Sequence, residues 1–316
     1  MIYSLNVLLV VVRVSLSGAI LDVNYYKKSC PEVEDIISTI VRNATVYDRQ
    51  VPARILRMFF HDCFLRGCDA SVLLDSTPDH KAEKDGLANL SLAGYYVIDD
   101  AKTHLEQTCP GTVSCADILA IAARDSVVRS GGPSWKVLKG RKDGRISIAE
   151  DTKYLPTFYS NTSQLIQSFS EKGLSVKDLV ALSGAHTLGF SHCESFEHRL
   201  RNFSSAHDTD PTLDPQFAAE LKGKCAKPNT DPNAGEYLDS SSRVFDNNYY
   251  KRVVGGKGIF ESDQTLMGDY RTRWRVETFA KFEGLFFIEF ARAMVRLGNV
   301  GVVENGEVRA NCRFVN

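Results

Sequence analysis

The chain has 316 residues, 43% of them hydrophobic, and a formal net charge of −1 at pH 7. This length suits one large domain or two halves that share a core, and the composition is that of an ordinary globular protein. The near-zero net charge argues against a strongly basic protein that binds nucleic acids or membrane surfaces. No apolar run after the N-terminus is long enough to span a bilayer.

The N-terminus predicts a secretory signal peptide. Residues 5–16 are mostly apolar, and the small residues 17–19 follow them, so we expect residues 1–19 to be cleaved off after Ala19. Arg13 interrupts the apolar run, and a buried strand is the alternative interpretation. A secretory route also fits the four N-x-Ser/Thr sequons, which begin at Asn43, Asn89, Asn161 and Asn202.

Helical periodicity dominates the rest of the chain, and strand signals are sparse. Within the helix predicted over 115–128, residues 117–123 are apolar nearly all round, which indicates a central helix. Two polar segments, 204–215 and 226–243, are predicted to be loops. The prediction is an all-α fold. One helix ends at about residue 61, and the others cover residues 31–46, 97–105, 115–128, 161–169, 176–183 and 276–297.

Arg57 and His61 form the first candidate site. They are four residues apart, so both project from one face of a helix and place a fixed cation beside a titratable base. Phe60 adds an apolar wall that excludes water and strengthens the electrostatics. A solvated arginine and an ordinary histidine on a surface helix are the alternative.

An oxygen-rich stretch follows directly. Asp62, Asp69 and Ser71 offer side-chain oxygens, and Leu65 and Gly67 can offer carbonyls. Clustered oxygen donors at irregular spacing suit a hard cation such as calcium.

A second candidate site surrounds His186, at the end of the apolar helix 176–183. A lone histidine there is more often a core residue than a ligand. However, Gly184, Ala185 and Gly189 are small, which leaves room for something flat and bulky against that helix end.

Together, the stretch 57–71 and the segment 178–189 resemble the distal and proximal motifs of the secretory (class III) plant haem peroxidases. The similarity runs from about Val23 to Asn316. It implies a haem peroxidase domain over residues 20–316. The distal half would cover about 20–160 plus the C-terminal segment, the proximal half about 161–284, and the haem would lie between them.

The resemblance also implies roles for single residues. One haem b would be ligated through its iron by His186, whose other ring nitrogen would donate to Asp263. Neutral His61 would transfer the peroxide proton, so we expect activity to fall at acid pH. The remaining implied positions are Arg57 and Asn89 as catalytic partners of His61, Phe60 beside the haem, and Pro156 at the substrate entrance.

Two calcium ions are implied as well, and we expect chelation to lower activity and stability together. The ligands of the first would be Asp62, Leu65, Gly67, Asp69 and Ser71, with Glu83 linked to this ion through water. The ligands of the second would be Thr187, Asp239, Ser241, Val244 and Asp246. Ser242 is the alternative to Ser241 in the second site.

The eight cysteines, none of them in a CxxC pair, predict four disulfides in a secreted chain. Sequence alone leaves about 105 connectivities open. The resemblance implies the pairs Cys30–Cys109, Cys63–Cys68, Cys115–Cys312 and Cys193–Cys225.

The resemblance therefore implies a monomeric peroxidase that reduces hydrogen peroxide to water. It would oxidise phenolic donors, including lignin precursors, by one-electron steps, and it would have no nucleic-acid or membrane partner. The absence of a C-terminal extension after the last cysteine segment favours the cell exterior over the vacuole. The alternatives are a disulfide-rich calcium-binding recognition module and, more remotely, a metal-dependent hydrolase, for which an HExxH motif is missing.

Overall fold

The structure is a computed structural model, and it describes residues 21–225, 231 and 233–316. The signal peptide predicted for residues 1–19 lies outside these described residues.

The described chain is mostly helical, which confirms the all-α prediction. Its short strands β1 (Phe190–His192) and β2 (Gly235–Tyr237) pair antiparallel, with Ser191 opposite Glu236. The α-helices are α1 (Val33–Tyr47), α2 (Val51–Leu65), α3 (Tyr95–Thr108), α4 (Cys115–Arg129), α5 (Thr162–Glu171), α6 (Val176–Ser183), α7 (Pro215–Lys224), α8 (Asn248–Val254), α9 (Glu261–Gly268), α10 (Tyr270–Lys281) and α11 (Glu283–Leu297).

The predicted helix over 276–297 is wrong, because α10 and α11 are separate helices. The break falls at Phe282, where the backbone turns to φ −127° and ψ 84°. Gly284 follows two residues later, in the first turn of α11. At the end of α10, the side-chain amide of Asn247 donates to the carbonyls of Phe279 (2.9 Å) and Ala280 (3.0 Å), so it satisfies orphan acceptors there. A partner distant in sequence therefore helps to end this helix.

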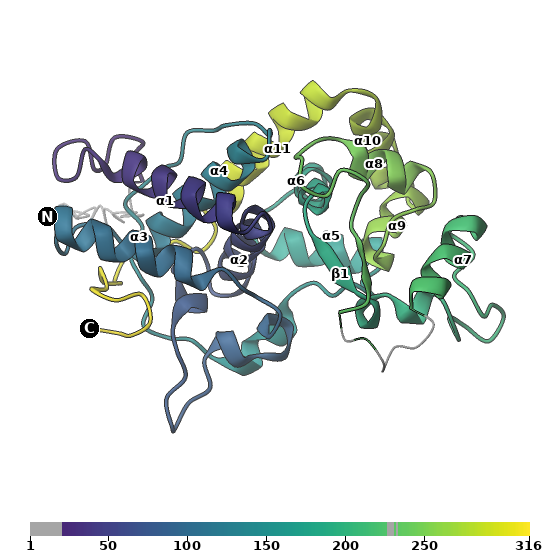
Figure 1. Ribbon diagram of the computed structural model, residues 1–316, viewed down its shortest axis with the longest axis horizontal. Helices are drawn as coiled ribbons and strands as arrows, with labels where there is room; N and C mark the ends of the chain where they lie inside the picture. Colours follow the sequence, from purple (N-terminus) through teal and green to yellow (C-terminus); the bar gives the residue numbers. More distant parts are fainter. Residues whose placement is uncertain (1–20, 226–230, 232) are drawn as a thin grey trace, which may run out of the picture.

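Helices α1 to α4 gather on one side of the molecule (Figure 1). The predicted central helix is α4, which contacts α1, α2 and α3 and is buried over most of its length. Its first turn is capped by the Ser114 hydroxyl, which accepts the N–H of Asp117.

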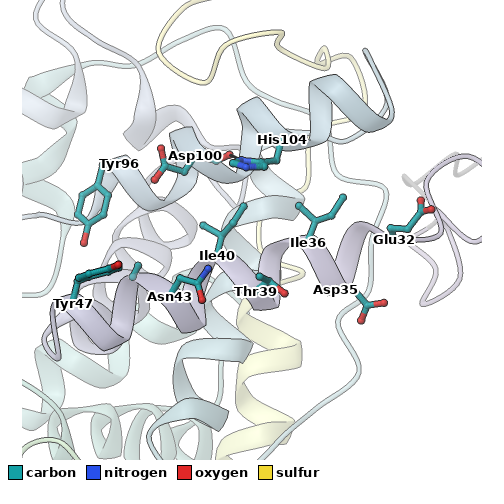
Figure 2. Close-up of a pocket in the computed structure, with 11 residues that line it drawn as sticks. Glu32, Asp35, Ile36, Thr39, Ile40, Asn43, Tyr47, Tyr96, Asp100 and His104 are labelled. Carbon is teal, nitrogen blue, oxygen red and sulfur yellow. Dashed lines mark hydrogen bonds between the residues drawn. The ribbon is translucent and has the colours of Figure 1, made fainter.

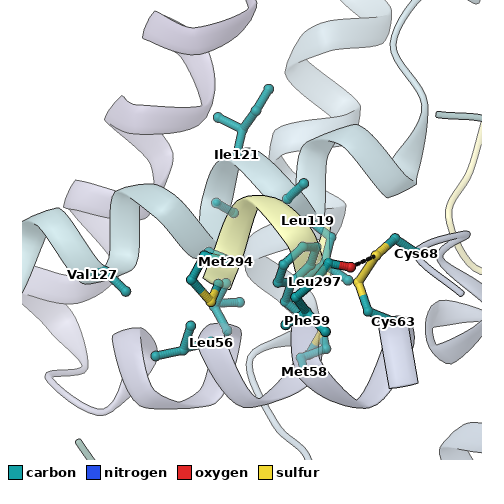
Figure 3. Close-up of a cluster of buried hydrophobic side chains, with 14 of the residues drawn as sticks. Leu56, Met58, Phe59, Cys63, Cys68, Leu119, Ile121, Val127, Met294 and Leu297 are labelled. Carbon is teal, nitrogen blue, oxygen red and sulfur yellow. Dashed lines mark hydrogen bonds between the residues drawn. A yellow bond between two sulfur atoms is a disulfide. The ribbon is translucent and has the colours of Figure 1, made fainter. Parts of the chain in front are cut away.

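Helices α5, α6 and α8 to α10 lie on the other side, and α11 contacts both groups through α2 and α6. Figure 3 shows the resulting core, in which Leu56 and Phe59 of α2 lie near Met294 and Leu297 of α11. This packing fixes the position of α2, which carries the first candidate site.

Disulfides fix the loops that helices alone leave free. All four expected pairings are present, which confirms that prediction. Cys115–Cys312 joins residues 197 positions apart and ties the C-terminal segment to the start of α4. Cys193–Cys225 lies within a second, smaller apolar cluster that includes Phe196 and Phe217.

In the described part of the chain, none of the helices combines the length and the apolarity needed to cross a bilayer.

Candidate active site

The first site stands on α2, which continues four residues beyond its expected end, to Leu65. The His61 side chain is buried, and its Nδ1 lies 2.6 Å from Oδ1 of Asn89. The amide nitrogen of Asn89 in turn donates to the carbonyl of Glu83 at 2.9 Å. That second bond fixes which end of the amide faces the ring. Nδ1 of His61 therefore carries the proton, and Nε2 is left with a free lone pair.

Burial and the neighbouring charge of Arg57 lower the pKa of His61 to about 3, against the opposing effect of the Asn89 hydrogen bond. The ring is therefore neutral at neutral and mildly acid pH. His61 is thus a base whose protonation is suppressed by its surroundings.

Arg57 lies one turn before His61, as expected. Its guanidinium donates to the Ser91 hydroxyl (3.1 Å) and the Ala88 carbonyl (3.2 Å). The side chain remains accessible, yet enclosure by surrounding protein lowers its pKa to about 10, so it stays charged at neutral pH. The short loop around Asn89 therefore positions both the base and the cation.

Phe60 forms part of an aromatic cluster. Its ring centroid lies 6.1 Å from that of His61 and stacks on Phe64 at 4.6 Å, and Phe169 of α5 lies 6.2 Å away. The predicted apolar wall therefore continues from α2 into α5.

The second site lies where α6 ends. A short 3-10 turn, Gly184–Thr187, carries His186, whose Nδ1 lies 2.8 Å from Oδ1 of Asp263 in the first turn of α9. The other carboxylate oxygen of Asp263 accepts the N–H of Phe260 at 3.2 Å. Nδ1 of His186 is thereby committed to donation. Its Nε2 has no hydrogen-bond partner among the described residues, and the side chain is 39% exposed.

The surroundings of His186 fit a residue that binds a haem iron. An accessible imidazole with a free Nε2, held by a carboxylate at Nδ1, is the environment of a metal-binding histidine. On α2, a neutral His61 and a charged Arg57 offer a base and a cation on one helical face.

The glycines near His186 act differently from what the sequence predicted. A Cβ on Gly184 would lie 2.4 Å from the Tyr250 hydroxyl and 2.5 Å from the Phe286 ring, so this position admits protein side chains rather than a flat ligand. Gly189 has φ +114°, and a Cβ there would lie 3.6 Å from that of Ala53 on α2. The backbone just after His186 therefore approaches the helix that carries His61.

Sequence reasoning missed Tyr249 and Phe260. The Tyr249 hydroxyl donates to Oδ1 of Asp263 at 3.0 Å, and the Phe260 ring lies 5.3 Å from that of His186 in an edge-to-face arrangement. Phe260 lies three residues before Asp263, so its position next to α9 could have indicated a contact with His186. Tyr249 lies on α8, and no local sequence pattern indicates its contact with Asp263.

The first oxygen cluster contains three buried carboxylates, those of Asp62, Asp69 and Glu83. Among the described residues, both Glu83 oxygens and the Ser71 hydroxyl have no hydrogen-bond partner, and Arg66 Nε lies 3.9 Å from Glu83 Oε1. Burial, reinforced by the charges of Asp62 and Asp69, raises the pKa of Glu83 to about 9. Unpaired buried oxygens of this kind fit a bound cation.

The expected carbonyl ligands already have protein partners. The Leu65 carbonyl accepts a hydrogen bond from Lys172 Nζ at 2.7 Å, and the Gly67 carbonyl accepts the N–H of Asp69 at 2.8 Å. Within residues 21–225, 231 and 233–316, no three His, Cys, Asp or Glu side chains form a ready-made metal cage. Any cation here would use carbonyl and hydroxyl oxygens as well as carboxylates.

The second oxygen cluster gathers around Thr187. Its hydroxyl lies 2.5 Å from Oδ2 of Asp239, 3.2 Å from Oδ1 of Asp246 and 3.4 Å from the carbonyl of Val244. The Ser241 hydroxyl donates to Oδ1 of Asp239 at 3.0 Å. The rival residue Ser242 contributes a carbonyl that accepts the N–H of Gly189. Of the two serines, Ser241 is the one whose hydroxyl reaches the cluster.

Pro156 is half-buried and begins a segment that approaches the second site. Two residues later, the Phe158 carbonyl accepts the N–H of Ser262 at 3.1 Å, and the Phe158 ring lies 6.0 Å from that of Phe260. The segment expected at the substrate entrance thus reaches His186 through two aromatic rings.

A groove of about 590 Å³ runs between α1 and α3 on another part of the surface (Figure 2). Asn43 lines it and is exposed, whereas Asn89 is buried against His61. None of the residues assigned to either candidate site lines this groove.

Comparison with known proteins gives one consistent family. A family model described as peroxidase matches residues 33–282. Peroxidase 66 of Arabidopsis thaliana is 63% identical over 95% of this chain and 94% of its own length. Peroxidase 64 of Arabidopsis thaliana is 50% identical over 99% of both chains, and Peroxidase 5 of Vitis vinifera is 49% identical over 94% and 92%.

The matched region includes α2 and the turn that carries His186, so it covers both candidate sites. The chain therefore belongs to the peroxidase family, as its resemblance to the secretory plant haem peroxidases predicted, and is a haem enzyme that reduces hydrogen peroxide with electrons from a donor.

Proposed function

We propose that this peroxidase is a secreted, monomeric enzyme of the cell exterior that oxidises phenols, including lignin precursors, one electron at a time. The observation that carries the site assignment is the pair of oriented histidines. His61 is oriented by Asn89 and is kept neutral by burial and by the charge of Arg57, and His186 is held by Asp263 with Nε2 free.

We assign His186 as the residue that holds one haem b, through Nε2 and the iron. When bound, the haem supplies the electrons that cleave the oxygen–oxygen bond of hydrogen peroxide and recovers them singly from the donor. Asp263 fixes the tautomer of His186 and increases its electron donation.

His61 moves the proton. Its Nε2 takes the proton from one peroxide oxygen and returns it to the other, which then leaves as water. Asn89 keeps the other nitrogen protonated, so the ring has one acceptor and its direction is set.

Arg57 stabilises the negative charge that develops on the leaving oxygen as the bond breaks. Its hydrogen bonds to Ser91 and Ala88 hold the guanidinium in place before the substrate arrives. This preorganisation matters because a guanidinium that must first reorient would contribute less.

We place the phenolic donor near Pro156. The Phe158 and Phe260 rings form an aromatic surface between that segment and His186. Such a surface suits a flat aromatic alcohol, since aromatic rings favour offset or edge-to-face contacts with each other.

We also propose two structural calcium ions, with the ligand sets that the resemblance implies. The unpaired oxygens of Glu83 and Ser71 support the first, and the gathering of oxygens around Thr187 supports the second. The division into a distal half (about 20–160 plus the C-terminal segment) and a proximal half (about 161–284) remains part of the same proposal.

The donor assignment is tested with steady-state kinetics on a cinnamyl-alcohol phenol and on an inorganic donor such as iodide. Substituting Phe158→Ala should raise KM for the phenol and leave the iodide reaction unchanged. Equal effects on both donors, or on neither, would place the phenol elsewhere.

A further inference from the structure

One carboxylate oxygen of Asp263 accepts two hydrogen bonds. Oδ1 lies 2.8 Å from Nδ1 of His186 and 3.0 Å from the hydroxyl of Tyr249. The other oxygen accepts the backbone N–H of Phe260 at 3.2 Å. The Tyr249 hydroxyl and the His186 imidazole therefore share a single acceptor atom, Oδ1 of Asp263.

Tyr249 is well placed for this contact. It lies on α8 and is 2% exposed, with its ring 4.9 Å from that of Tyr250 and 6.1 Å from that of His186. A buried hydroxyl needs a partner, and the carboxylate provides a charged one, which makes the hydrogen bond shorter and stronger than a neutral one.

We propose that Tyr249 is a positioning residue that sets how strongly Asp263 polarises His186, and thereby sets the reduction potential of the bound iron. This inference rests on the proposed roles of His186 and Asp263. It adds Tyr249, a residue that takes no part in the proposed function above.

The physical reason is competition for one acceptor. Each donor withdraws negative charge from Oδ1, so the Tyr249 hydroxyl weakens the pull of Asp263 on the Nδ1 proton of His186. Without that hydroxyl, the imidazole would gain anionic character and donate more strongly through Nε2, which stabilises the oxidised metal.

The test uses the haem-loaded full chain carrying Tyr249→Phe. The substitution keeps the ring and removes the hydroxyl. We expect the reduction potential of the bound iron to fall by about 59 mV, measured by spectroelectrochemistry. This corresponds to a shift of roughly tenfold toward the oxidised form in a one-electron equilibrium. The iron–histidine stretch in the resonance Raman spectrum of the reduced protein should move to higher frequency.

The chain offers a matched control in Tyr250→Phe. The hydroxyl of this neighbouring, fully buried tyrosine donates to the backbone carbonyls of Val180 (2.8 Å) and Ala181 (3.3 Å) rather than to Asp263. Removing it costs a buried hydrogen bond between α8 and α6, and it should leave both the potential and the stretch unchanged.

A second probe covers the case in which Tyr249→Phe does not fold. Site-specific incorporation of 3-fluorotyrosine at position 249 keeps the hydroxyl and makes it a stronger donor, so the potential should move in the positive direction. Equal shifts in Tyr249→Phe and Tyr250→Phe would overturn the proposal. So would a potential that does not respond to the fluorinated residue.

Failure of the underlying site assignment gives a different result. If Asp263→Asn leaves the iron–histidine stretch unchanged, the His186–Asp263 pair is not the proximal ligand system, and both proposals fall. If Asp263→Asn lowers the stretch while Tyr249→Phe has no effect, the ligand assignment stands and the inference on Tyr249 is wrong.

Discussion

Asn89 joins His61 to Glu83, because its Oδ1 lies 2.6 Å from His61 Nδ1 while its Nδ2 donates to the Glu83 carbonyl at 2.9 Å. The carboxylate of Glu83 is buried in the first oxygen cluster. A single short segment therefore orients the proposed base and borders the proposed calcium site, which couples the chemistry to the cation.

Replacing the base tests the proton-transfer role. We expect His61→Leu to slow the reaction with hydrogen peroxide by roughly 10²–10⁴-fold, the usual contribution of a positioned general base. Asn89→Leu should give a smaller loss, because it removes the orientation of His61 and keeps the ring. Stopped-flow absorbance of the haem protein measures both. Asn43→Gln, which changes an exposed asparagine in the distant groove, is the control.

Removing the adjacent cation should separate charge stabilisation from proton transfer. We expect Arg57→Leu to slow the peroxide reaction by about 10²–10³-fold, as for the loss of one preorganised donor to a developing anion. The pKa of His61 should also rise, since the charge of Arg57 helps to lower it. A variant with the wild-type rate would remove Arg57 from the mechanism.

The pH dependence follows from the neutral His61. Because its folded-state pKa is lowered from 6.5 to about 3, the base stays active through mildly acid conditions, and the rate should fall only near pH 3. The same lowered pKa makes the free energy of unfolding change with pH in the same direction as the rate. This contribution to stability is fully present above pH 6.5. It is lost as the pH falls toward 3, because the unfolded chain then binds a proton that folded His61 does not bind. A rate that is half-maximal near pH 6.5 would contradict this environment for His61.

Calcium removal should lower thermal stability and peroxide reactivity together, because Asp62 directly follows His61 on α2. Glu83→Gln should reproduce the effect of chelation by weakening the first site. Calcium content and unfolding temperature are measured together, and Asp79→Asn, at an exposed carboxylate, serves as the control. Full metal removal without change in stability or rate would refute a structural role for calcium.

The sequons should differ in occupancy when the chain passes through a secretory host. Asn43 is exposed in the groove between α1 and α3, whereas the side-chain amide of Asn89 is buried and holds His61. Peptide mass analysis after enzymatic deglycosylation should find sugar at Asn43 and none at Asn89. A glycan on Asn89 in active enzyme would contradict the role of its amide.

Local sequence was sufficient where helical spacing carried the information. The four-residue spacing of Arg57 and His61 placed them on one face, and the apolar run 176–183 gave α6 with the predicted bounds. The family resemblance supplied the disulfide partners, which spacing alone left open.

Contacts between distant segments were beyond local reasoning. Asn247 helps to end α10 from outside that helix, and Tyr249 reaches Asp263 from a different helix, so no periodicity signals either contact. Similarly, the choice between Ser241 and Ser242 depends on backbone turns in a polar loop, where the side-chain direction has no repeating pattern.

The most direct test of the central claim is the visible absorption spectrum of the purified haem-loaded protein before and after an equimolar amount of hydrogen peroxide. We predict a Soret band that shifts with peroxide in the wild type, returns when a phenol is added, and responds far more slowly to peroxide in His61→Leu. A folded protein that takes up no haem, or a Soret band that ignores peroxide in the wild type, would contradict the assignment of His186 and His61.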